Sequence, residues 1–396
     1  MILNRYNITS LFLLLFHFLI LLFATNDFSL SYKEVELYFS NDGLIGKVSN
    51  IFTPLFGQND FAVRLPFILF YLASSVLFYL LTNNYFKKEW DRVISVAIFM
   101  MLPGVNSAAL LLNESIIVIF CTLLYLYLYK INKKKYYNHI LLAFFIFIDN
   151  SFAIFYLSLF FYSLNKKDNF LLVYSLILFG ISMSIYGFDV MNKPKGYLID
   201  TFGIYASIFS PLLFLYFFYS LYRVGIKFEK DIYWYISMTA LGLSLIFSLR
   251  QRVDIEDFAP FVVIAIPIMV RLFFHSYRVR LKEYRVKHKI VTNIVIGVLI
   301  INFLVFIFNK SLYLFLDVPK KHFAYNYHIA KELASKLKAK NINKLYTKDY
   351  KLQRRLLFYG IGYDTNISLV KSKDNEKSNI DISYYNRVID RFFLDA

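Results

Sequence analysis

Two carboxylates near the start of the first long polar segment have the residue type and setting of a general base. Glu34 and Glu36 lie in the stretch Ser31-Tyr32-Lys33-Glu34-Val35-Glu36-Leu37-Tyr38. On a helix, Glu34, Leu37 and Tyr38 would share one face at i, i+3 and i+4, whereas Glu36 would point elsewhere. A partly desolvated carboxylate gains basicity and can take a proton from a hydroxyl or an amine. The alternative is a solvated loop acid.

A third carboxylate, Glu114, stands between two apolar runs in the sequence Leu112-Asn113-Glu114-Ser115. It has the chemistry of an assisting catalytic acid or base. Asn113 and Ser115 are equally suited to cap a helix, and Glu114 would then favour the positive end of that helix. The residues leave both interpretations open.

Three arginines at the ends of apolar runs could bind a phosphate, because a guanidinium group holds phosphate oxygens in a bidentate fork. They are Arg64, Arg250 and Arg252. The alternative for Arg64 is that its guanidinium group extends to the membrane–water interface or pairs with Asp60.

Arg250 and Arg252 could instead pair with the acids that follow them. These acids, which we keep as secondary site candidates, are Asp254, Glu256 and Asp257. Oxygen ligands of this kind suit a divalent metal, although the spacing defines no ligand set and no cofactor is certain.

Other common chemistries lack their sequence signals. The only cysteine is Cys121, which excludes an internal disulfide and a cysteine-rich metal site. The six histidines form no HxxxH or HExxH pattern. The sequence also contains no Walker loop, no GxGxxG and no GxSxG elbow, so nucleotide binding and esterase activity lack support.

The composition indicates that membrane helices position these residues. Of 396 residues, 58% are hydrophobic and 18% charged, which excludes an ordinary soluble enzyme and a disordered chain. Since a span needs about 20 apolar residues, the sequence predicts eleven transmembrane helices. They are Asn7–Ala24, Leu65–Leu81, Val93–Leu112, Ser115–Tyr129, His139–Ile148, Ser151–Leu164, Phe170–Tyr186, Tyr205–Tyr222, Ile232–Leu249, Phe258–Phe274 and Ile290–Phe308. The short fifth and sixth runs could instead form one broken span or a helical hairpin.

Charge predicts the orientation of the spans. Twenty Lys and Arg residues fall on one side of them and seven on the other, with the tail excluded. The positive-inside rule makes the first side cytoplasmic. The N-terminus is then inside and, with eleven spans, the C-terminal tail is outside. The net charge of +17 is therefore mainly a topology signal, and no nucleic-acid partner is expected.

The composition changes after Phe308, so we predict two domains. Residues 1–308 form a transmembrane domain with an outer loop at 25–64, and residues 309–396 form a small extracytoplasmic α/β domain. In the second we expect helices at His322–Lys340 and Leu352–Tyr359 and strands near Lys344–Thr347, Ile367–Lys371 and Asn379–Tyr385. This domain holds 17 basic and 9 acidic residues, which suggests contact with anionic head groups or an acidic glycan.

The run FGQNDFAVRLPFILFYLASSVLFYLLTNNYF, with Arg64-Leu65-Pro66, carries a family resemblance. It resembles the start of the second span in GT-C superfamily glycosyltransferases that use polyprenyl-phosphate sugars, in the branch of lipid A aminoarabinose transferases and protein O-mannosyltransferases. That family carries an acidic pair early in its first outer loop. Lys33 stands where the family prefers Asp, which leaves open whether Glu34, Glu36 or neither residue is the base.

The resemblance implies a GT-C-like, all-α polytopic enzyme that transfers a hexosyl or pentosyl group. The donor would be a polyprenyl-phosphate sugar, and the acceptor a lipid, glycan or protein on the outer side of a bacterial inner membrane. It further implies Glu34 as the base, Glu114 as its assistant, and Arg64, Arg250 and Arg252 as contacts for the phosphate. The alternatives are a transporter or flippase of lipid-linked glycans and an inactive scaffold with the same fold.

Overall fold

The computed structural model describes residues 5–40, 43–131, 136–187, 195–372 and 379–395. Four of the lysines counted for the orientation lie outside this set, namely Lys133, Lys134, Lys135 and Lys193. The chain divides into two compact units. The first comprises Met1–His17, Phe70–Ala109 and Glu114–Phe303, and the second comprises Phe18–Leu69, Leu110–Asn113 and Leu304–Ala396.

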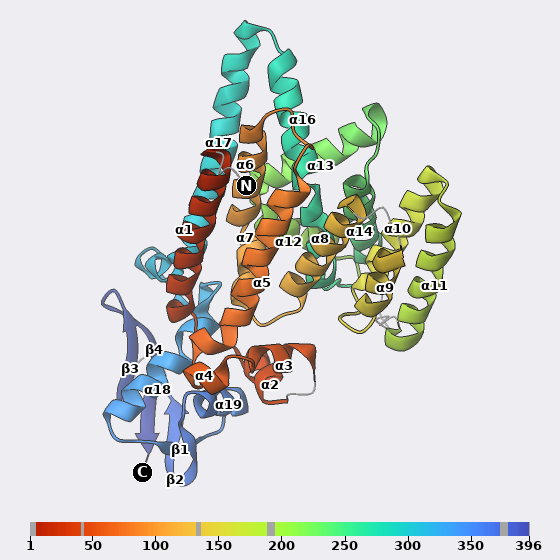
Figure 1. Cartoon of the computed structure of the whole chain (residues 1–396). Helices are drawn as coiled ribbons and strands as arrows, with labels where there is room; N and C mark the ends of the chain where they lie inside the picture. The colour runs from red at the N-terminus through yellow and green to blue at the C-terminus, as the bar shows by residue number, and fades with distance from the viewer. Residues whose placement is uncertain (1–4, 41–42, 132–135, 188–194, 373–378, 396) are drawn as a thin grey trace. The chain divides into compact units, whose positions relative to one another are not determined.

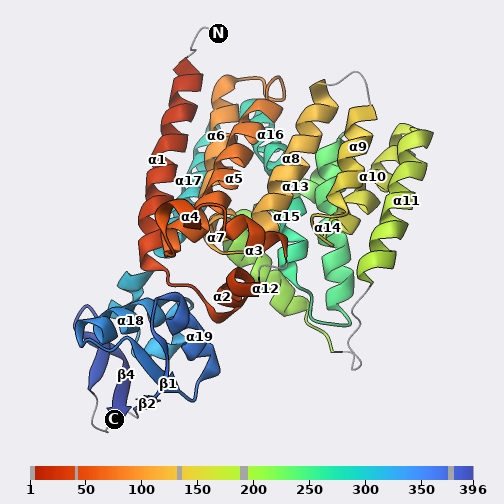
Figure 2. The ribbon, with the colours of Figure 1, turned by 60° about the horizontal axis from the view of Figure 1, so that its bottom comes forward.

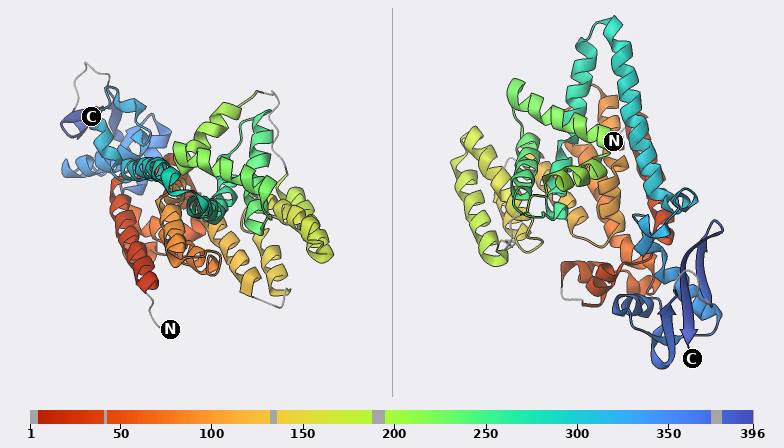
Figure 3. Two further views of the ribbon diagram at one scale, coloured as in Figure 1. Left: turned by 90° about the horizontal axis from the view of Figure 1, so that it is seen from above. Right: turned by 180° about the vertical axis from the view of Figure 1, so that it is seen from behind.

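The first unit is helical because its sequence consists of long apolar runs separated by short polar breaks. Four of its helices, α1 (Arg5–Asp27), α5 (Asp60–Leu81), α7 (Pro103–Leu110) and α17 (Lys282–Ile307), contribute residues to both units. The others are α6 (Glu89–Met101), α8 (Ser115–Ile131), α9 (Tyr136–Phe145), α10 (Phe152–Lys166), α11 (Asn169–Tyr186), α12 (Leu198–Phe209), α13 (Pro211–Lys227), α14 (Ile232–Ser248), α15 (Ala259–Val262) and α16 (Ile266–Val279). Helices α10 and α11 pack side by side, and α16 and α17 form a hairpin (Figures 1 and 3).

Proline breaks two of the predicted spans into bent pairs. Helices α6 and α7 meet at 56° beside Pro103, and α12 and α13 meet at 104° at Pro211. Proline has no N–H to donate and disfavours helical geometry in the residue before it. Leu102, before Pro103, is accordingly extended, with a φ of −61° and a ψ of 126°, and Ser210, before Pro211, is also non-helical, with a φ of 78° and a ψ of 136°.

Five helical segments in the described part of the chain are long and apolar enough to cross a membrane. They are α1, α5, α11, α17 and the segment Ile255–Val279, and counting each bent pair as one span gives seven. Helices α8 and α14 are apolar but only 17 residues long. The chain is thus a multi-pass membrane protein, whereas the count of eleven spans and the orientation stay predictions.

The second unit contains a four-stranded sheet in the order β1-β2-β4-β3. Its strands are β1 (Lys344–Thr347), β2 (Gly362–Lys371), β3 (Ile380–Tyr384) and β4 (Arg387–Asp395). Strands β1 and β2 are parallel and joined through α19 (Tyr350–Phe358), while β4 is antiparallel to both β2 and β3. Helix α18 (Ala330–Ala339) also packs near the sheet (Figure 2). Buried Leu333, Leu337, Leu345, Leu356 and Leu369 form the core, so the predicted α/β character is confirmed.

Two predictions in this unit are corrected. The helix expected over His322–Lys340 is only α18, preceded by 3-10 turns at Pro319–Lys321 and Tyr325–His328. One reason is that His322 Nδ1 accepts a hydrogen bond from the backbone N–H of Ala324 at 2.9 Å, which competes with helical pairing. Strand β4 was not predicted, because Asp390 and Arg391 interrupt its apolar alternation.

Three short helices follow α1 in the second unit, namely α2 (Tyr32–Ser40), α3 (Leu44–Ser49) and α4 (Thr53–Phe56). Helix α2 is the helix expected around Glu34. Glu34 and Tyr38 are buried, as expected for one shared face, whereas Leu37 is half-buried like Glu36 and Val35 is buried as well. Helix α2 packs against α3 and α19.

Candidate functional site

A reciprocal pair of hydrogen bonds starts helix α2. The backbone N–H of Glu34 donates to Ser31 Oγ at 3.3 Å, and the N–H of Ser31 donates to Glu34 Oε2 at 2.7 Å. This is a capping box, in which Ser31 and Glu34 satisfy two N–H groups that would otherwise lack partners. The sequence Ser31-x-x-Glu34 signals it, but our sequence reasoning followed only the helical face and missed it.

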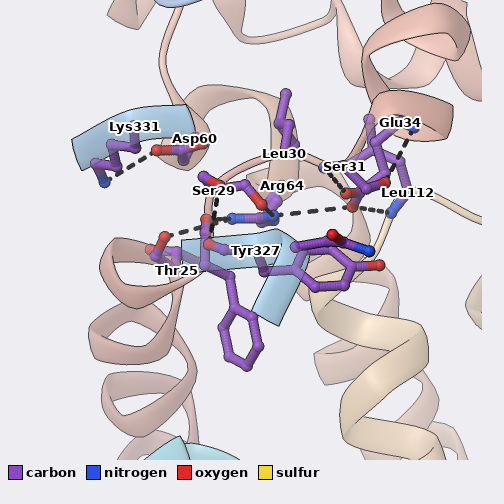
Figure 4. A network of polar contacts seen from close by, with 12 residues as sticks. Thr25, Ser29, Leu30, Ser31, Glu34, Asp60, Arg64, Leu112, Tyr327 and Lys331 are labelled. Atoms are coloured by element: carbon purple, nitrogen blue, oxygen red, sulfur yellow. Dashed lines mark hydrogen bonds and ion pairs between the residues drawn. The ribbon is translucent and has the colours of Figure 1, made fainter. Parts of the chain in front are cut away.

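The other oxygen of Glu34 lies between a backbone donor and an arginine. Oε1 accepts a hydrogen bond from the N–H of Leu112 at 3.2 Å and lies 3.8 Å from Arg64 Nη2 (Figure 4). Glu34 is only 4% exposed, so these interactions act with little screening by water. The carboxylate is therefore firmly oriented, with Oε2 held more closely than Oε1.

Arg64 is fully buried at the start of α5 and joins separate parts of the chain. Its guanidinium donates to the carbonyl oxygens of Thr25 at 3.4 Å, Ser29 at 3.4 Å and Phe28 (Figure 4). Only Nε lacks a partner among the described residues. The arginine of the Arg64-Leu65-Pro66 motif thus clamps the end of α1 and the segment after it to Glu34.

Asp60 has different partners from those expected. Its carboxylate accepts a hydrogen bond from the Tyr359 hydroxyl at 2.5 Å and pairs with Lys331 Nζ at 2.9 Å. The alternative that Arg64 pairs with Asp60 is therefore wrong, because Glu34 is the acid paired with Arg64. Burial, with the nearby Asp60 charge, raises the pKa of Tyr359 well above its usual value, so its hydroxyl stays a donor.

Two residues hold the segment before Glu34 in place, one in α19 and one directly after it, and sequence reasoning gave them no role. Arg355 donates through Nε to the carbonyl of Leu30 at 2.8 Å and through Nη2 to Ser29 Oγ at 3.1 Å. The hydroxyl of Tyr359 accepts from the N–H of Leu30 at 2.8 Å. The stretch Leu352–Gly360 was noted only for its resemblance to an outer domain, and its local pattern does not reveal these distant partners.

Glu36, the other candidate base, lies away from this network. Its Oε1 pairs with Arg354 Nε at 2.8 Å, and both side chains are about one-third exposed. The two carboxylates of α2 therefore differ in environment, since Glu34 is buried beside a buried arginine and Glu36 is part of a surface ion pair.

The remaining candidates belong to the first unit. Ser115 Oγ donates to the carbonyl of Glu256 at 3.2 Å, which joins the start of α8 to the turn Ile255–Asp257. The carboxylates of Glu114, Asp254 and Glu256 are near enough to Asp257 to repel its charge. Asp149 acts on Asp257 in the same way, so Asp257 is the acid that these charges share as a neighbour.

Arg250 and Arg252 are exposed, and neither forms an ion pair with any described residue. The predicted alternative, that they pair with Asp254, Glu256 or Asp257, is therefore not observed. Within the described ranges, no group of three or more His, Cys, Asp or Glu side chains is arranged to hold a metal ion.

Comparison with known proteins identifies the fold. Residues 48–162 match the model of a family described as dolichyl-phosphate-mannose-protein mannosyltransferase. A crystal structure of ArnT from Cupriavidus metallidurans bound to undecaprenyl phosphate shares the fold, with a TM-score of 0.54 and 12% identity over 89% of this chain and 84% of that one. The structure of the same protein in the apo state gives a TM-score of 0.53 and 14% identity over the same shares. No curated protein matches the sequence.

These matches confirm the predicted resemblance to GT-C membrane glycosyltransferases of the aminoarabinose transferase and protein mannosyltransferase branch. The family match includes the Arg64-Leu65-Pro66 motif that suggested it. The fold is that of ArnT. Because Glu34 and Arg64 lie in one compact unit and Glu114, Arg250 and Arg252 in the other, their convergence on one site stays a prediction.

Proposed function

We propose that the chain is a glycosyltransferase that moves a sugar from a polyprenyl-phosphate donor to a lipid, glycan or protein acceptor. The observation that carries this proposal is the fold shared over 89% of the chain with ArnT, which was crystallised with undecaprenyl phosphate. Transfer would occur on the outer side of a bacterial inner membrane, where the predicted topology places the segment around Glu34. The sugar would be a hexosyl or pentosyl group.

Glu34 is the proposed general base. Its Oε2 is anchored by Ser31 at 2.7 Å, while Oε1 has the longer contacts, 3.2 Å to Leu112 N and 3.8 Å to Arg64. Oε1 would accept the proton of the acceptor hydroxyl as the acceptor oxygen forms its bond to the anomeric carbon. The bond from that carbon to the phosphate oxygen would break, and polyprenyl phosphate would leave with the electron pair. Glu114 is the proposed assistant of this base.

Arg250 and Arg252 are the proposed contacts for the departing phosphate. Their guanidinium groups are exposed and have no carboxylate partner in the described ranges, so they can meet a phosphate without first breaking an ion pair. Arg64 is fully buried and its donors face carbonyls and Glu34. We therefore assign Arg64 as a positioning residue that acts through Glu34.

The test is transfer from a labelled undecaprenyl-phosphate sugar by the full chain in lipid nanodiscs, with membrane extracts as the source of acceptor. Glu34→Gln should lower the transfer rate by about 10²–10⁴-fold, the usual contribution of a general base. Glu36→Gln is the matched control on the same helix and should leave the rate nearly unchanged, because Glu36 is held by Arg354 at the surface.

Three outcomes would contradict the assignment. A folded Glu34→Gln variant with full activity would exclude Glu34 as the base. Donor binding without turnover by the unaltered chain would favour an inactive scaffold. Movement of a lipid-linked glycan between leaflets, without sugar transfer, would favour a flippase.

A further inference from the structure

A cavity of about 680 Å³ lies inside the second unit, and none of the roles above uses it. The start of α2, the loop from β1 into α19, and the strands β2 and β4 line it. Its apolar lining includes the buried Leu352, Leu369 and Phe392. The volume and the mixture of apolar and polar walls are those of a small-molecule site.

The two acids in this cavity are already engaged. Asp349 caps α19 by accepting hydrogen bonds from the backbone N–H groups of Lys351 at 3.0 Å and Leu352 at 3.2 Å. Asp390 pairs with Lys371 Nζ at 2.5 Å and accepts from the Tyr325 hydroxyl at 2.8 Å. Among the described residues, the only ion pair of either carboxylate is the one between Asp390 and Lys371.

Three lysines and one buried arginine of the lining remain without a carboxylate. Lys33, Lys348 and Lys351 are exposed and form no ion pair with any described residue. Arg355 is only 7% exposed, and its described hydrogen bonds go to the neutral oxygens of Ser29, Leu30 and Asn326.

Burial lowers the pKa of the Arg355 guanidinium, although the charges of Glu34 and Asp349 oppose this shift, so an anion in the adjoining cavity would offset part of the remaining cost. Together with Lys371, these cations give the lining five basic residues against two acidic ones, so the pocket has a net positive charge.

Aromatic side chains stand beside these cations. Tyr32, Tyr325, Tyr327 and Phe392 line the cavity, and Lys351 Nζ lies 5.7 Å from the centre of the Tyr32 ring. Aromatic faces supply flat apolar surface in ligand pockets, while a few charged groups fix the orientation of the ligand. A sugar-like ring could pack its C–H faces against the aromatic side chains, and one anionic substituent could bind the cations.

We propose that this cavity binds a sugar carrying a phosphate or carboxylate group, and that this sugar is part of the acceptor. The second clause rests on the proposed function, whereas binding itself requires no turnover. Lys348 and Lys351 would contact the anion at the rim, and Arg355 would face it from the wall. The site lies wholly within the second unit.

The test is titration calorimetry of the full chain in detergent at low salt. The probes are glucose 6-phosphate, glucuronic acid, inorganic phosphate and glucose. We expect both anionic sugars to bind more tightly than inorganic phosphate, and glucose not to bind. Lys348→Ala/Lys351→Ala should weaken the anionic sugars by about tenfold, since two charge-assisted contacts are lost. The matched control is Lys321→Ala/Lys338→Ala, two exposed lysines of the same unit outside the cavity.

Equal affinity of both double variants for glucose 6-phosphate would overturn the site. Equal binding of inorganic phosphate and glucose 6-phosphate would overturn recognition of a sugar, and absence of all binding would overturn the whole proposal. The acceptor role is tested separately in the transfer assay, where Lys348→Ala/Lys351→Ala should raise the KM for an acidic acceptor without lowering kcat. Anionic-sugar binding with no transfer activity would reject the proposed function while the binding site stands.

Discussion

Replacing Arg64 by methionine should destabilise the second unit by about 3 kcal/mol. Arg64 is fully buried and Glu34 is 4% exposed, so removing the guanidinium leaves a buried carboxylate with only two backbone donors. Breaking a buried ion pair in this way typically costs 3–5 kcal/mol. We expect the lower end, because the Nη2–Oε1 distance is 3.8 Å and the hydrogen bonds from Ser31 and Leu112 remain.

The matched control is Arg354→Met, which removes the other arginine–glutamate pair of α2. Arg354 and Glu36 are closer, at 2.8 Å, but their side chains are 32% and 35% exposed. Ion pairs exposed to water contribute about 0–1 kcal/mol. The comparison thus asks whether burial, rather than the distance between charges, determines the energy of the pair.

The assay is thermal unfolding of the purified chain in one detergent at one scan rate. A loss of about 3 kcal/mol corresponds to a fall in Tm of roughly 6–12 °C for a unit of this size, against at most a few degrees for Arg354→Met. The double variant Arg64→Met/Glu34→Gln should lose less stability than the sum of the losses in the two single variants, because the two residues interact. Equal Tm shifts for Arg64→Met and Arg354→Met, or strict additivity in the double variant, would refute the reasoning.

Three further outcomes follow from the same contacts. Burial lowers the pKa of His328 to about 3, so below pH 6.5 the unfolded chain takes up a proton that the folded chain does not. Stability should therefore fall as the pH drops from 6.5 toward 3, by roughly 2 kcal/mol at pH 5, and His328→Gln should flatten this profile in acid-unfolding scans. Tyr359→Phe removes the hydroxyl that donates to buried Asp60 at 2.5 Å. The free energy of unfolding should fall by about 1–3 kcal/mol, which scanning fluorimetry would detect as a lower Tm. Arg250→Gln/Arg252→Gln should lower sugar transfer while leaving Tm unchanged, since both side chains are exposed; a large Tm shift would mark them as structural.

The helices and the tail domain were predictable to the extent that their signals are local. Apolar runs mark the helices, and β1 has the predicted bounds Lys344–Thr347. Pro103 and Pro211 were visible in the sequence, but the bend angles of 56° and 104° depend on packing against other helices. Strand β4 pairs with two neighbours although Asp390 and Arg391 break its apolar pattern, because strand pairing across a sheet is a long-range effect.

The candidate site shows the same limit. Glu34 could be singled out from its helical face and from the family resemblance, and the capping box with Ser31 is also a local signal. The partners that orient it are not local, since Arg64 lies 30 residues away and Leu112 lies 78 residues away along the chain. Arg355 is 325 residues from the Leu30 carbonyl that it binds. No spacing rule within one helix encodes such contacts.

Burial and existing partners separate the arginines that can meet a substrate from those that hold the fold. Arg64 is buried, and its donors are occupied by carbonyls and one carboxylate, so binding a phosphate would require breaking the clamp around Glu34. Arg250 and Arg252 are exposed and unpaired among the described residues, so an incoming phosphate displaces only water.

Arg355 combines both properties, because it is buried and anchors the segment before Glu34 but also lines a cavity whose lysines outnumber its acids. The charge of the side chain does not distinguish Arg64, Arg250, Arg252 and Arg355. Their different surroundings predict that losing Arg64 affects stability first, losing Arg250 and Arg252 affects transfer first, and losing Arg355 affects both.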